Sequence, residues 1–467
     1  MEMRKDIFQL QFENKQTLRN TTAKERIEKL IKLEKWILTN RESIKTAIYK
    51  DFKKSFDETE LTEIYPVLSE LRHAKRNLSK WMKSKRVKRT LTLITQKAYL
   101  KYEAKGNVLI ISPWNYPFLL SIGPLVSSIS AGNTAIIKPS EFTNHTSDLL
   151  EKMISELFSK SETAVVQGGK EISSELLELN FDHIFFTGSS EVGKIIAKSA
   201  AEKLTTITLE LGGKSPVIVD ETAHLRSSAE KIIWGKFLNK GQTCIAPDYV
   251  LVDKKIADQF SKLLIESIEK LYGTSIKNIN SNGDYARIIS EKHHNKLTEM
   301  LENALKNGSK ILYGGKHNSN DKFIEPTLIL SDCKNCGIAK DEIFGPLLPI
   351  IQYDEIDGAI DWINSRSCPL TIYIFSNNKK NIDKITSRTQ TGSVGINELV
   401  VQFSHNYMPF GGVRNSGFGR SHGYFGFKEF SNERAYLKSG KINFLKIIYP
   451  PYTKSKKKII DLMVRYF

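Results

Sequence analysis

The beginning of the chain alternates apolar and polar positions with the period of an α-helix. Between Thr22 and about Lys50 the apolar residues recur on one face, and Thr22 with Glu25 forms a capping-box pattern at the start. A second stretch with helical spacing covers about residues 58–82. The pattern therefore predicts two amphipathic helices before the first strand.

The period then changes to one that is typical of strands. Residues 90–95 and 98–102 are rich in threonine, tyrosine and β-branched side chains, which favour extended backbone. We expect two strands that form an arm leaving the body of the domain. The alternative is a hairpin that packs on its own domain.

From Val108 onward, short unbroken apolar runs alternate with longer helix-like stretches. The predicted strands of this first block are residues 108–111, 134–137, 163–166, 183–186 and 206–209, with helices such as 144–158 and 192–202 between them. Such alternation predicts a parallel sheet covered on both faces. A second α/β block is expected over residues 217–410, with strands at 249–252, 371–375 and 393–396. The glycine-rich residues 409–426 are expected to form a loop over a site.

Polar residues follow four strands of the first block, at the edge where ligands bind in open parallel sheets. Asn115 offers amide donors that suit a developing oxyanion. Lys138 suits ribose hydroxyls or a phosphate, and residues 188–193 precede a helix whose N-terminus suits a phosphate. Taken singly, Asn115 is equally a turn residue and Lys138 the start of a loop.

Cys244 is the candidate nucleophile. It follows a Gly-Gln-Thr loop and is one of only four cysteines in the chain. A reachable thiol with a lowered pKa attacks carbonyl carbons, whereas a buried structural cysteine is inert. The polar strand ends elsewhere in the chain favour the nucleophile.

Two other motifs are weaker. Gly188, Gly193 and Lys194 nearly match a phosphate-binding P-loop, but Ile195 stands where Ser or Thr must bind magnesium, which disfavours a nucleotide triphosphatase. The Cys-x-x-Cys at residues 333–336 lacks a second pair and a histidine at ligand spacing. We therefore expect no metal site.

Composition places the chain among ordinary globular proteins. It has 467 residues, of which 40% are hydrophobic and 26% charged, enough for two or three domains with a large core. The scattered cysteines do not resemble a disulfide framework, the N-terminus lacks a secretory signal, and no apolar run reaches about 18 residues. These features predict a cytoplasmic protein.

The formal charge of +17 allows nucleic acid, an anionic membrane or an anionic ligand as a partner. Most lysines alternate with glutamates along helical stretches, which favours a solvated surface. The denser basic runs at residues 83–89 and 454–458 lack the interleaved aromatic residues that stack on single-stranded bases. We expect no nucleic-acid partner.

Six motifs in order resemble the signature set of the aldehyde dehydrogenase superfamily. They are residues 110–115, 138–141, 186–189, 209–214, 241–244 and 342–346. Residues 244–249 and 406–417 resemble its class 3 branch, which includes the fatty aldehyde dehydrogenases. Arg414 departs from that branch, where glycine is common, and leaves the shape of its loop open.

The resemblance implies an α/β, aldehyde dehydrogenase-like fold with a Rossmann-type cofactor domain, an α/β catalytic domain and a small β oligomerisation arm. The implied cofactor domain covers residues 1–85 and 103–212, with 413–432 returning to it, and the catalytic domain covers 213–412. The arm covers residues 86–102 and 433–442, and a basic amphipathic tail covers 443–467. A strand near residues 434–441 would join the interface of a homodimer.

The resemblance also assigns roles. Cys244 would attack the aldehyde, Asn115 and the Cys244 backbone N–H would hold the oxyanion, and Glu210 would activate the water that releases a free acid. A CoA-acylating enzyme, which would not need Glu210, is the alternative. The implied cofactor is NAD, with NADP as an alternative that the carboxylate of Glu141 disfavours by charge repulsion. The cofactor-binding candidates are Ser112, Trp114, Lys138, Glu141, Thr187, Gly188, Ser189, Gly193, Glu342 and Phe344.

The expected substrate is a medium- or long-chain aliphatic aldehyde or an aromatic one. Four aromatic residues lie near motifs that line the substrate tunnel in the family, although each alone suits core packing equally. They are Tyr65, Tyr116, Trp234 and Phe403. The sequence does not identify the physiological aldehyde.

The end of the chain has the pattern of an interfacial amphipathic helix. Ile459, Ile460, Met463, Val464 and Phe467 share one face, and basic residues flank it. Such a helix contacts an anionic membrane surface without spanning the bilayer. The alternatives are a helix that docks on the protein over the substrate entrance, and a frayed end.

Overall fold

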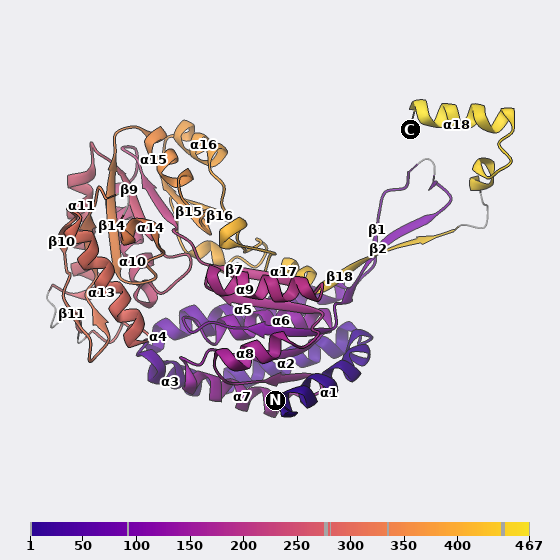
Figure 1. Cartoon of the computed structure of the whole chain (residues 1–467), viewed down its shortest axis with the longest axis horizontal. Helices are drawn as coiled ribbons and strands as arrows, with labels where there is room; N and C mark the ends of the chain where they lie inside the picture. Colours follow the sequence, from indigo (N-terminus) through magenta and orange to yellow (C-terminus); the bar gives the residue numbers. More distant parts are fainter. Residues whose placement is uncertain are drawn as a thin grey trace.

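The computed structural model describes residues 2–90, 93–274, 279–280, 282–333, 336–439 and 444–466. The chain forms a body with two lobes, each built on one large sheet, and an arm that projects from the body (Figure 1). The N-terminus lies on the first lobe, and the end of the chain lies beyond the arm.

Helices precede the first large sheet. They are α1 (Glu2–Arg19), α2 (Ala23–Thr39), α3 (Arg41–Phe52), α4 (Phe56–Thr59), a π-helical segment (Glu60–Ile64) and α5 (Tyr65–Trp81). The predicted capping box is confirmed, because Thr22 Oγ1 accepts from Glu25 N and Glu25 Oε2 accepts from Thr22 N. The single helix predicted over residues 22–50 is wrong, since it breaks at Asn40. The Asn40 amide donates to Trp36 O at 2.9 Å, and this local bond competes with the helical pattern.

The first lobe contains a six-stranded sheet in the order β17-β7-β6-β3-β4-β5. Its strands are β3 (Asn107–Ile111), β4 (Thr134–Lys138), β5 (Thr163–Val165), β6 (His183–Gly188), β7 (Thr206–Leu211) and β17 (Gly417–Phe418). All pairings are parallel except that of β17 with β7. The parallel sheet and its five strands are therefore confirmed.

Helices cover both faces of this sheet because successive strand residues point to opposite sides. Val108 and Ile110 of β3 pack in a core with α2, α5, α6 (Leu119–Ala131) and α7 (Asn144–Leu157). Leu109 and Ile111 pack in a separate core with α1, α8 (Lys170–Leu177) and α9 (Ser190–Glu202). The unbroken apolar runs of the sequence thus correspond to strands buried on both sides.

The second lobe contains a seven-stranded sheet in the order β10-β13-β14-β9-β8-β15-β16. Its strands are β8 (Pro216–Val219), β9 (Tyr249–Asp253), β10 (Lys310–Tyr313), β13 (Thr327–Leu330), β14 (Leu347–Tyr353), β15 (Thr371–Phe375) and β16 (Ser393–Ile396). Its helices are α10 (Leu225–Phe237), α11 (Ala257–Tyr272), α13 (Glu291–Lys306), α14 (Gly337–Lys340), α15 (Ile356–Asn364) and α16 (Lys379–Arg388). A short hairpin, β11 (His317–Asn318) with β12 (Phe323–Ile324), lies apart from the sheet. The strands predicted at 371–375 and 393–396 match β15 and β16.

The glycine-rich residues 409–426 form a short strand and the start of a helix in addition to the predicted loop. A 3₁₀ turn (Arg414–Ser416) leads into β17, which adds an edge strand to the first sheet beside Glu210. The chain then enters α17 (Gly423–Glu429), which packs against α6. The second lobe is thereby tied back to the first across the end of β7.

The arm is a three-stranded antiparallel sheet of β1 (Lys85–Arg86), β2 (Lys97–Ala104) and β18 (Ser431–Lys438). The strand predicted over residues 90–95 is wrong: Leu93 N donates to Thr90 O in a turn, while residues 91–92 lie outside the described part. The late strand expected at 434–441 begins earlier, and residues 440–441 are not described.

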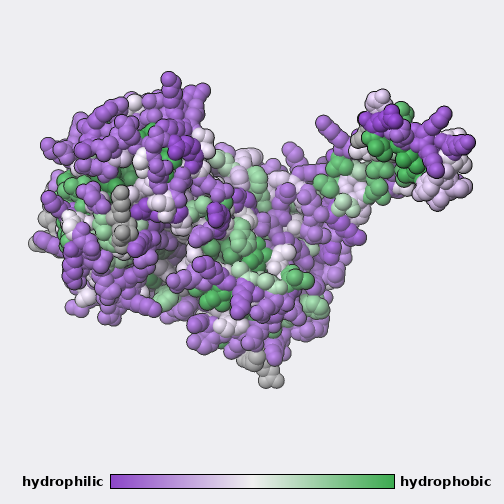
Figure 2. Space-filling view, turned by 45° about the horizontal axis from the view of Figure 1, so that its top comes forward, coloured by the Kyte–Doolittle hydropathy of each residue, from purple (hydrophilic) through white to green (hydrophobic). Residues whose placement is uncertain are grey.

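Beyond the arm, a 3₁₀ segment (Phe444–Ile448) precedes α18 (Lys454–Tyr466). The helix stands away from both lobes of its own chain (Figure 1), so it does not cover a cavity of the body. Figure 2 shows hydrophobic and strongly hydrophilic side chains side by side at this end of the molecule. Phe467, expected on the apolar face, lies outside the described residues.

Candidate active site

A largely apolar cavity of about 300 Å³ opens at the junction of the two lobes. Its wall contains Cys244 and Glu210 and, from several different elements, the four aromatic residues expected in a tunnel: Tyr65, Tyr116, Trp234 and Phe403. Leu61, Leu119 and Leu120 add to the apolar wall. The structure thus brings the candidate nucleophile, the candidate base and the candidate tunnel residues together.

The loop before Cys244 is held in a tight left-handed turn. Asn239, Lys240 and Gly241 have φ values of 50°, 57° and 74°. A Cβ on Gly241 would lie 2.4 Å from Gly345 O, so a side chain does not fit there. The next residue, Gln242, is held by its buried side chain. Its Nε2 donates to Arg287 O and its Oε1 accepts from Ile289 N, both at 3.0 Å. This turn directs the chain so that Cys244 reaches the cavity wall.

Asn115 lies directly against this loop. Its Nδ2 donates to Gln242 O at 3.0 Å, and its own carbonyl accepts from Asn239 Nδ2 at 2.7 Å. The neighbouring Tyr116 hydroxyl lies 2.7 Å from Thr243 Oγ1. The residues after β3 and the residues before the thiol are therefore joined into one unit, in which the Asn115 amide has a second N–H to offer.

Burial determines the protonation state of the Cys244 thiol. Removal from water, together with the carboxyls of Glu342 and Glu210, raises the pKa of Cys244 to about 12. In the ligand-free chain Cys244 is therefore a thiol at neutral pH, and a positive charge or a hydrogen-bond donor brought by a ligand would favour the thiolate.

Glu210, near the end of β7, faces the same cavity. Ser421 Oγ donates to its Oε1 at 2.9 Å, whereas Oε2 is buried without a hydrogen-bond partner among the described residues. Burial raises the pKa of Glu210 to about 8, while the Ser421 hydrogen bond and the charge of Arg420 act in the opposite direction. A carboxyl with a pKa near neutrality and one free oxygen suits a general base.

The polar residues of this cavity that sequence reasoning missed include Ser421, His422 and Glu70. Ser421 and His422 lie in the glycine-rich segment that was expected to cover a site, but nothing in that segment singles them out. Glu70 lies on α5, accepts from Gly423 N at 2.7 Å, and has its pKa raised to about 7 by burial. Burial lowers the pKa of His422 to about 4, so the imidazole is neutral.

The cofactor candidates gather at the carboxyl edge of the first sheet. Lys138 Nζ and Glu141 Oε2 pair at 3.0 Å, and Ser189 caps α9. Trp114 and Phe344 are in edge-to-face contact with ring centroids 5.3 Å apart. A Cβ on Gly193 would lie 2.8 Å from Leu211, so α9 approaches β7 closely where Gly193 lacks a side chain.

These residues fit a dinucleotide. The hydroxyls of Ser112 and Thr187 are buried without a hydrogen-bond partner in the part of the chain that is described, as expected of groups that await a ligand. Glu342 Oε1 accepts from Gly213 N at 3.0 Å, and burial raises the pKa of this carboxyl to about 7. Ser189 Oγ already accepts from Val192 N, and the Ile195 side chain has no oxygen that could bind a magnesium ion.

The other candidate features have structural explanations. Cys333 and Cys336 are joined by a disulfide, a bond that the scattered cysteines had not led us to expect. Within the described residues, no three or more His, Cys, Asp or Glu side chains form a group able to hold a metal.

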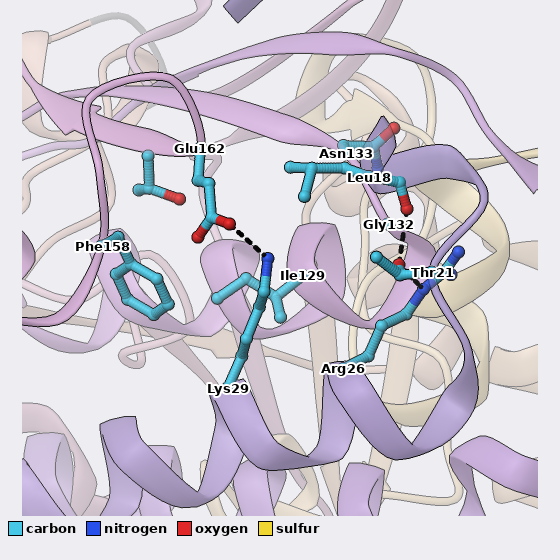
Figure 3. A pocket seen from close by; sticks show the side chains of 10 residues that line it. Leu18, Thr21, Arg26, Lys29, Ile129, Gly132, Asn133, Phe158 and Glu162 are labelled. Atoms are coloured by element: carbon cyan, nitrogen blue, oxygen red, sulfur yellow. Dashed lines mark hydrogen bonds and ion pairs between the residues drawn. The ribbon is translucent and has the colours of Figure 1, made fainter. Parts of the chain in front are cut away.

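A small hollow between α2 and α6 is filled by basic side chains (Figure 3). Arg26 donates to Thr21 Oγ1 and Ser130 O, both at 3.0 Å, and burial lowers its pKa to about 10. Lys29 forms an ion pair with Glu162 at 3.0 Å. Because the cations already have partners, this hollow stabilises the fold and does not suggest a ligand.

Comparison with known proteins gives one consistent result. Residues 8–436 match the aldehyde dehydrogenase family. A 4,4'-diaponeurosporen-aldehyde dehydrogenase of Staphylococcus aureus is 42% identical over 436 residues, which cover 93% of each chain. A dimeric, NADP-preferring aldehyde dehydrogenase of Rattus norvegicus is 39% identical over 428 residues, 91% of this chain and 93% of the relative.

A solved structure agrees over nearly the whole length. The substrate-bound state of Staphylococcus aureus AldH superposes with a TM-score of 0.95 at 39% identity and covers 99% of this chain and 100% of that one. The predicted fold class is therefore confirmed.

Proposed function

The chain belongs to the aldehyde dehydrogenase family and is an oxidoreductase that acts on aldehydes, and we propose that it converts a medium- or long-chain aliphatic or an aromatic aldehyde into the carboxylic acid. The observation that supports this most is that Cys244 and Glu210 line one apolar cavity, and that Oε2 of Glu210 has no hydrogen-bond partner among the described residues. The cavity supplies the nucleophile, the base and room for an apolar substrate.

In the proposed mechanism the Cys244 thiol loses its proton to water, and its Sγ bonds to the aldehyde carbon while the carbonyl π electrons move to the oxygen. The second amide N–H of Asn115 and the Cys244 backbone N–H hold the oxyanion of the thiohemiacetal. Loss of a hydride leaves a thioester on Cys244. Glu210 then takes a proton from a water molecule that attacks the thioester carbonyl, the C–S bond breaks, and the free acid leaves.

NAD is the proposed hydride acceptor, with NADP as an alternative. Ser112, Thr187 and Glu342 would hold it from the carboxyl edge of the sheet, and Lys138 with Glu141 would contact its ribose. When bound, the nicotinamide supplies the two-electron oxidation that no amino-acid side chain provides. The rat relative is named NADP-preferring, so the choice is to be measured as kcat/KM for the two cofactors.

The experiment that tests the function compares the wild type with Cys244→Ala and Glu210→Gln in octanal and NAD. The wild type should produce NADH and octanoic acid, Cys244→Ala should produce neither, and Glu210→Gln should give a hydride burst without steady turnover. Full activity of Cys244→Ala would contradict the assignment. A product that appears as acyl-CoA only when CoA is added would favour the CoA-acylating alternative.

The apolar cavity supports the proposed substrate class. Among the described lining residues only Glu70 and Glu210 carry a carboxyl group, and apolar side chains, chiefly aromatic rings and leucines, form most of the wall. A series of aldehydes should give higher kcat/KM for octanal and benzaldehyde than for glycolaldehyde. The reverse order would contradict this part of the proposal.

We propose domain boundaries that follow the sheets. The cofactor domain comprises residues 1–85, 103–212 and 413–432, the catalytic domain 213–412, the arm 86–102 and 433–442, and the tail 443–467. We also propose that two copies form a homodimer through the arm. The rat relative is named dimeric, and β18 lies at the edge of the three-stranded sheet.

We further propose a cytoplasmic protein whose tail touches an anionic membrane surface. No helix in the described ranges is long and apolar enough to cross a bilayer. Val464 on α18 is 79% exposed and lies on a helix that begins with lysines. The full chain should sediment with anionic vesicles at low salt and release at high salt, whereas a chain that ends at Pro451 should not. Equal behaviour of the two would contradict the membrane contact.

A further inference from the structure

The segment after β17 lies directly over Glu210. Gly417 pairs with Glu210 and Phe418 with Leu209 in an antiparallel register. Ser421 then forms a two-way backbone bridge with Phe410, with N–O distances of 2.7 and 3.2 Å. The backbone on both sides of the Ser421 side chain is therefore fixed relative to Glu210.

Charged and polar side chains hold the same segment. Arg420 Nη1 donates to Gly412 O and Gly419 O, each at 2.7 Å, and Arg420 N donates to Glu429 Oε2 at 3.3 Å. On the other side, Gly423 N donates to the buried Glu70. The position of Ser421 therefore does not depend on its contact with Glu210.

His422, the next residue, has a φ of 71°, which is unfavourable for a side chain of its size. Strained backbone of this kind persists only where the surroundings enforce it, and it gathers at functional sites. Here the strain lies between the Ser421 contact with Glu210 and the Gly423 contact with Glu70.

We propose that Ser421 is a positioning residue for thioester hydrolysis, which holds Oε1 of Glu210 so that Oε2 alone faces the cavity. This inference rests on the proposed role of Glu210 as the base. A carboxyl without such a contact rotates and presents either oxygen, whereas the 2.9 Å bond from Ser421 selects one orientation. The other oxygen, Oε2, is buried and has no hydrogen-bond partner among the described residues, so its lone pairs are not taken up by another protein group.

The same hydrogen bond also favours the working form of the base. A hydroxyl donates more strongly to a carboxylate than to a neutral carboxyl, so the bond stabilises ionised Glu210. When Oε2 takes the proton of the attacking water, the thiolate of Cys244 leaves and Oε1 still accepts from Ser421. Loss of that proton to solvent restores the carboxylate in the same orientation.

The test separates hydrolysis from hydride transfer. Ser421→Ala, Ser421→Thr and, as a control, Ser155→Ala are mixed with octanal and NAD; Ser155 is an exposed serine on α7. NADH formation reports the burst, and intact-protein mass after rapid quenching reports the decay of the acyl-enzyme. Both are followed across pH.

In Ser421→Ala the burst should keep its rate, while the acyl-enzyme should decay about tenfold more slowly at neutral pH. The midpoint of the decay rate against pH should move upward by about one unit, since a tenfold loss corresponds to one pKa unit. Ser421→Thr, which keeps the hydroxyl, and Ser155→Ala should both behave as the wild type does.

Unchanged decay and an unchanged midpoint in Ser421→Ala would overturn the inference. If that variant fails to fold, Ser421→Cys, a similar size with a weaker donor, decides by the same midpoint. A Glu210→Gln variant that hydrolyses as fast as the wild type would instead overturn the role of Glu210, and the inference with it. A slow Glu210→Gln beside a normal Ser421→Ala would overturn the inference alone.

Discussion

For single residues, removal from water sets the charge of Cys244 and Glu210 in the cavity and of Glu342 among the cofactor candidates. The pKa values of Cys244, Glu210 and Glu342 rise to about 12, 8 and 7, and burial is the first cause in each case. Near neutral pH the ligand-free chain therefore holds a thiol and a largely protonated base. Reactivity must then come with the ligands, which change the charge and hydration of the cavity.

The thiol of Cys244 should react slowly with iodoacetamide at neutral pH in the cofactor-free protein. Only the thiolate reacts, and a raised pKa means that its fraction grows as the pH rises. The alkylation rate should therefore increase by about tenfold per pH unit well beyond the usual thiol range. Peptide mapping would separate Cys244 from the free Cys368, and Cys244→Ala supplies the background. A rate that levels off near neutral pH would contradict this prediction.

Glu141→Gln should shift cofactor preference toward NADP. Two unit charges about 4 Å apart repel by roughly 1 kcal/mol even in bulk water, so removal of the carboxylate should raise the NADP/NAD ratio of kcat/KM by at least about fivefold. The change also frees Lys138, whose Nζ pairs with Glu141 at 3.0 Å. An unchanged ratio would mean that Glu141 does not face the ribose 2′ position.

At the scale of helices and strands, the sequence predicts those elements whose bounds follow from the spacing of apolar residues alone. The strand β15 matches the predicted bounds because buried parallel strands are short unbroken apolar runs, and the edge strand β16 matches its bounds as well. The break at Asn40 inside an otherwise regular pattern depends on one side-chain hydrogen bond, which periodicity does not register. Residues 90–95 have strand composition but form a turn where described, since composition does not specify a partner strand.

The active site likewise contains residues that local sequence motifs predict and residues that they do not. Cys244, Asn115 and Glu210 lie in local motifs and were predicted, as were the hydroxyls of Ser112 and Thr187. Ser421, in contrast, reaches Glu210, 211 residues away in the sequence, only because β17 pairs with β7. Such a long-range pairing has no local signal, and neither Ser421 nor Glu70 was identified from the sequence.

One buried ion pair should stabilise the elements behind the nucleophile loop. Lys54 and Glu63 are fully buried and 3.0 Å apart. Glu63 also accepts from Phe118 N and Leu119 N at the start of α6, and Lys54 lies 3.9 Å from the centre of the Tyr116 ring. Glu63→Gln should lower the free energy of unfolding by about 3–5 kcal/mol, because it leaves a buried charge unpaired.

Denaturant unfolding measures this loss. The control is Glu266→Gln, which breaks an exposed ion pair with Arg226. The side chains of Arg226 and Glu266 are 69% and 54% exposed. It should cost less than about 1 kcal/mol. A similar small cost for both variants would show that the Lys54–Glu63 pair does not stabilise this region.

At the scale of the whole molecule, the reactive groups come from different lobes. Glu210 lies near the end of a strand of the first sheet, Cys244 follows a helix of the second lobe, and the glycine-rich segment joins the two through β17. The arm takes no part in this cavity and projects away from it (Figure 1). In the described ranges its sheet has three strands and little of the body to pack against, which supports the proposed pairing of its outer strand with a second copy.

Leu437→Asp should therefore weaken the proposed dimer. Leu437 lies on the edge strand β18 and is 59% exposed in the single chain. If β18 lies in an interface, a carboxylate there must lose its water without a partner, and two copies of the change meet in a symmetric dimer. The dissociation constant should rise by at least about tenfold, which corresponds to about 1.4 kcal/mol. Light scattering over a concentration series measures it.

The matched control is Leu204→Asp, which makes the same change at a residue 91% exposed on the body, and it should leave the mass unchanged. A wild type that is monomeric at micromolar concentration, or equal masses for both variants, would contradict an arm-mediated dimer.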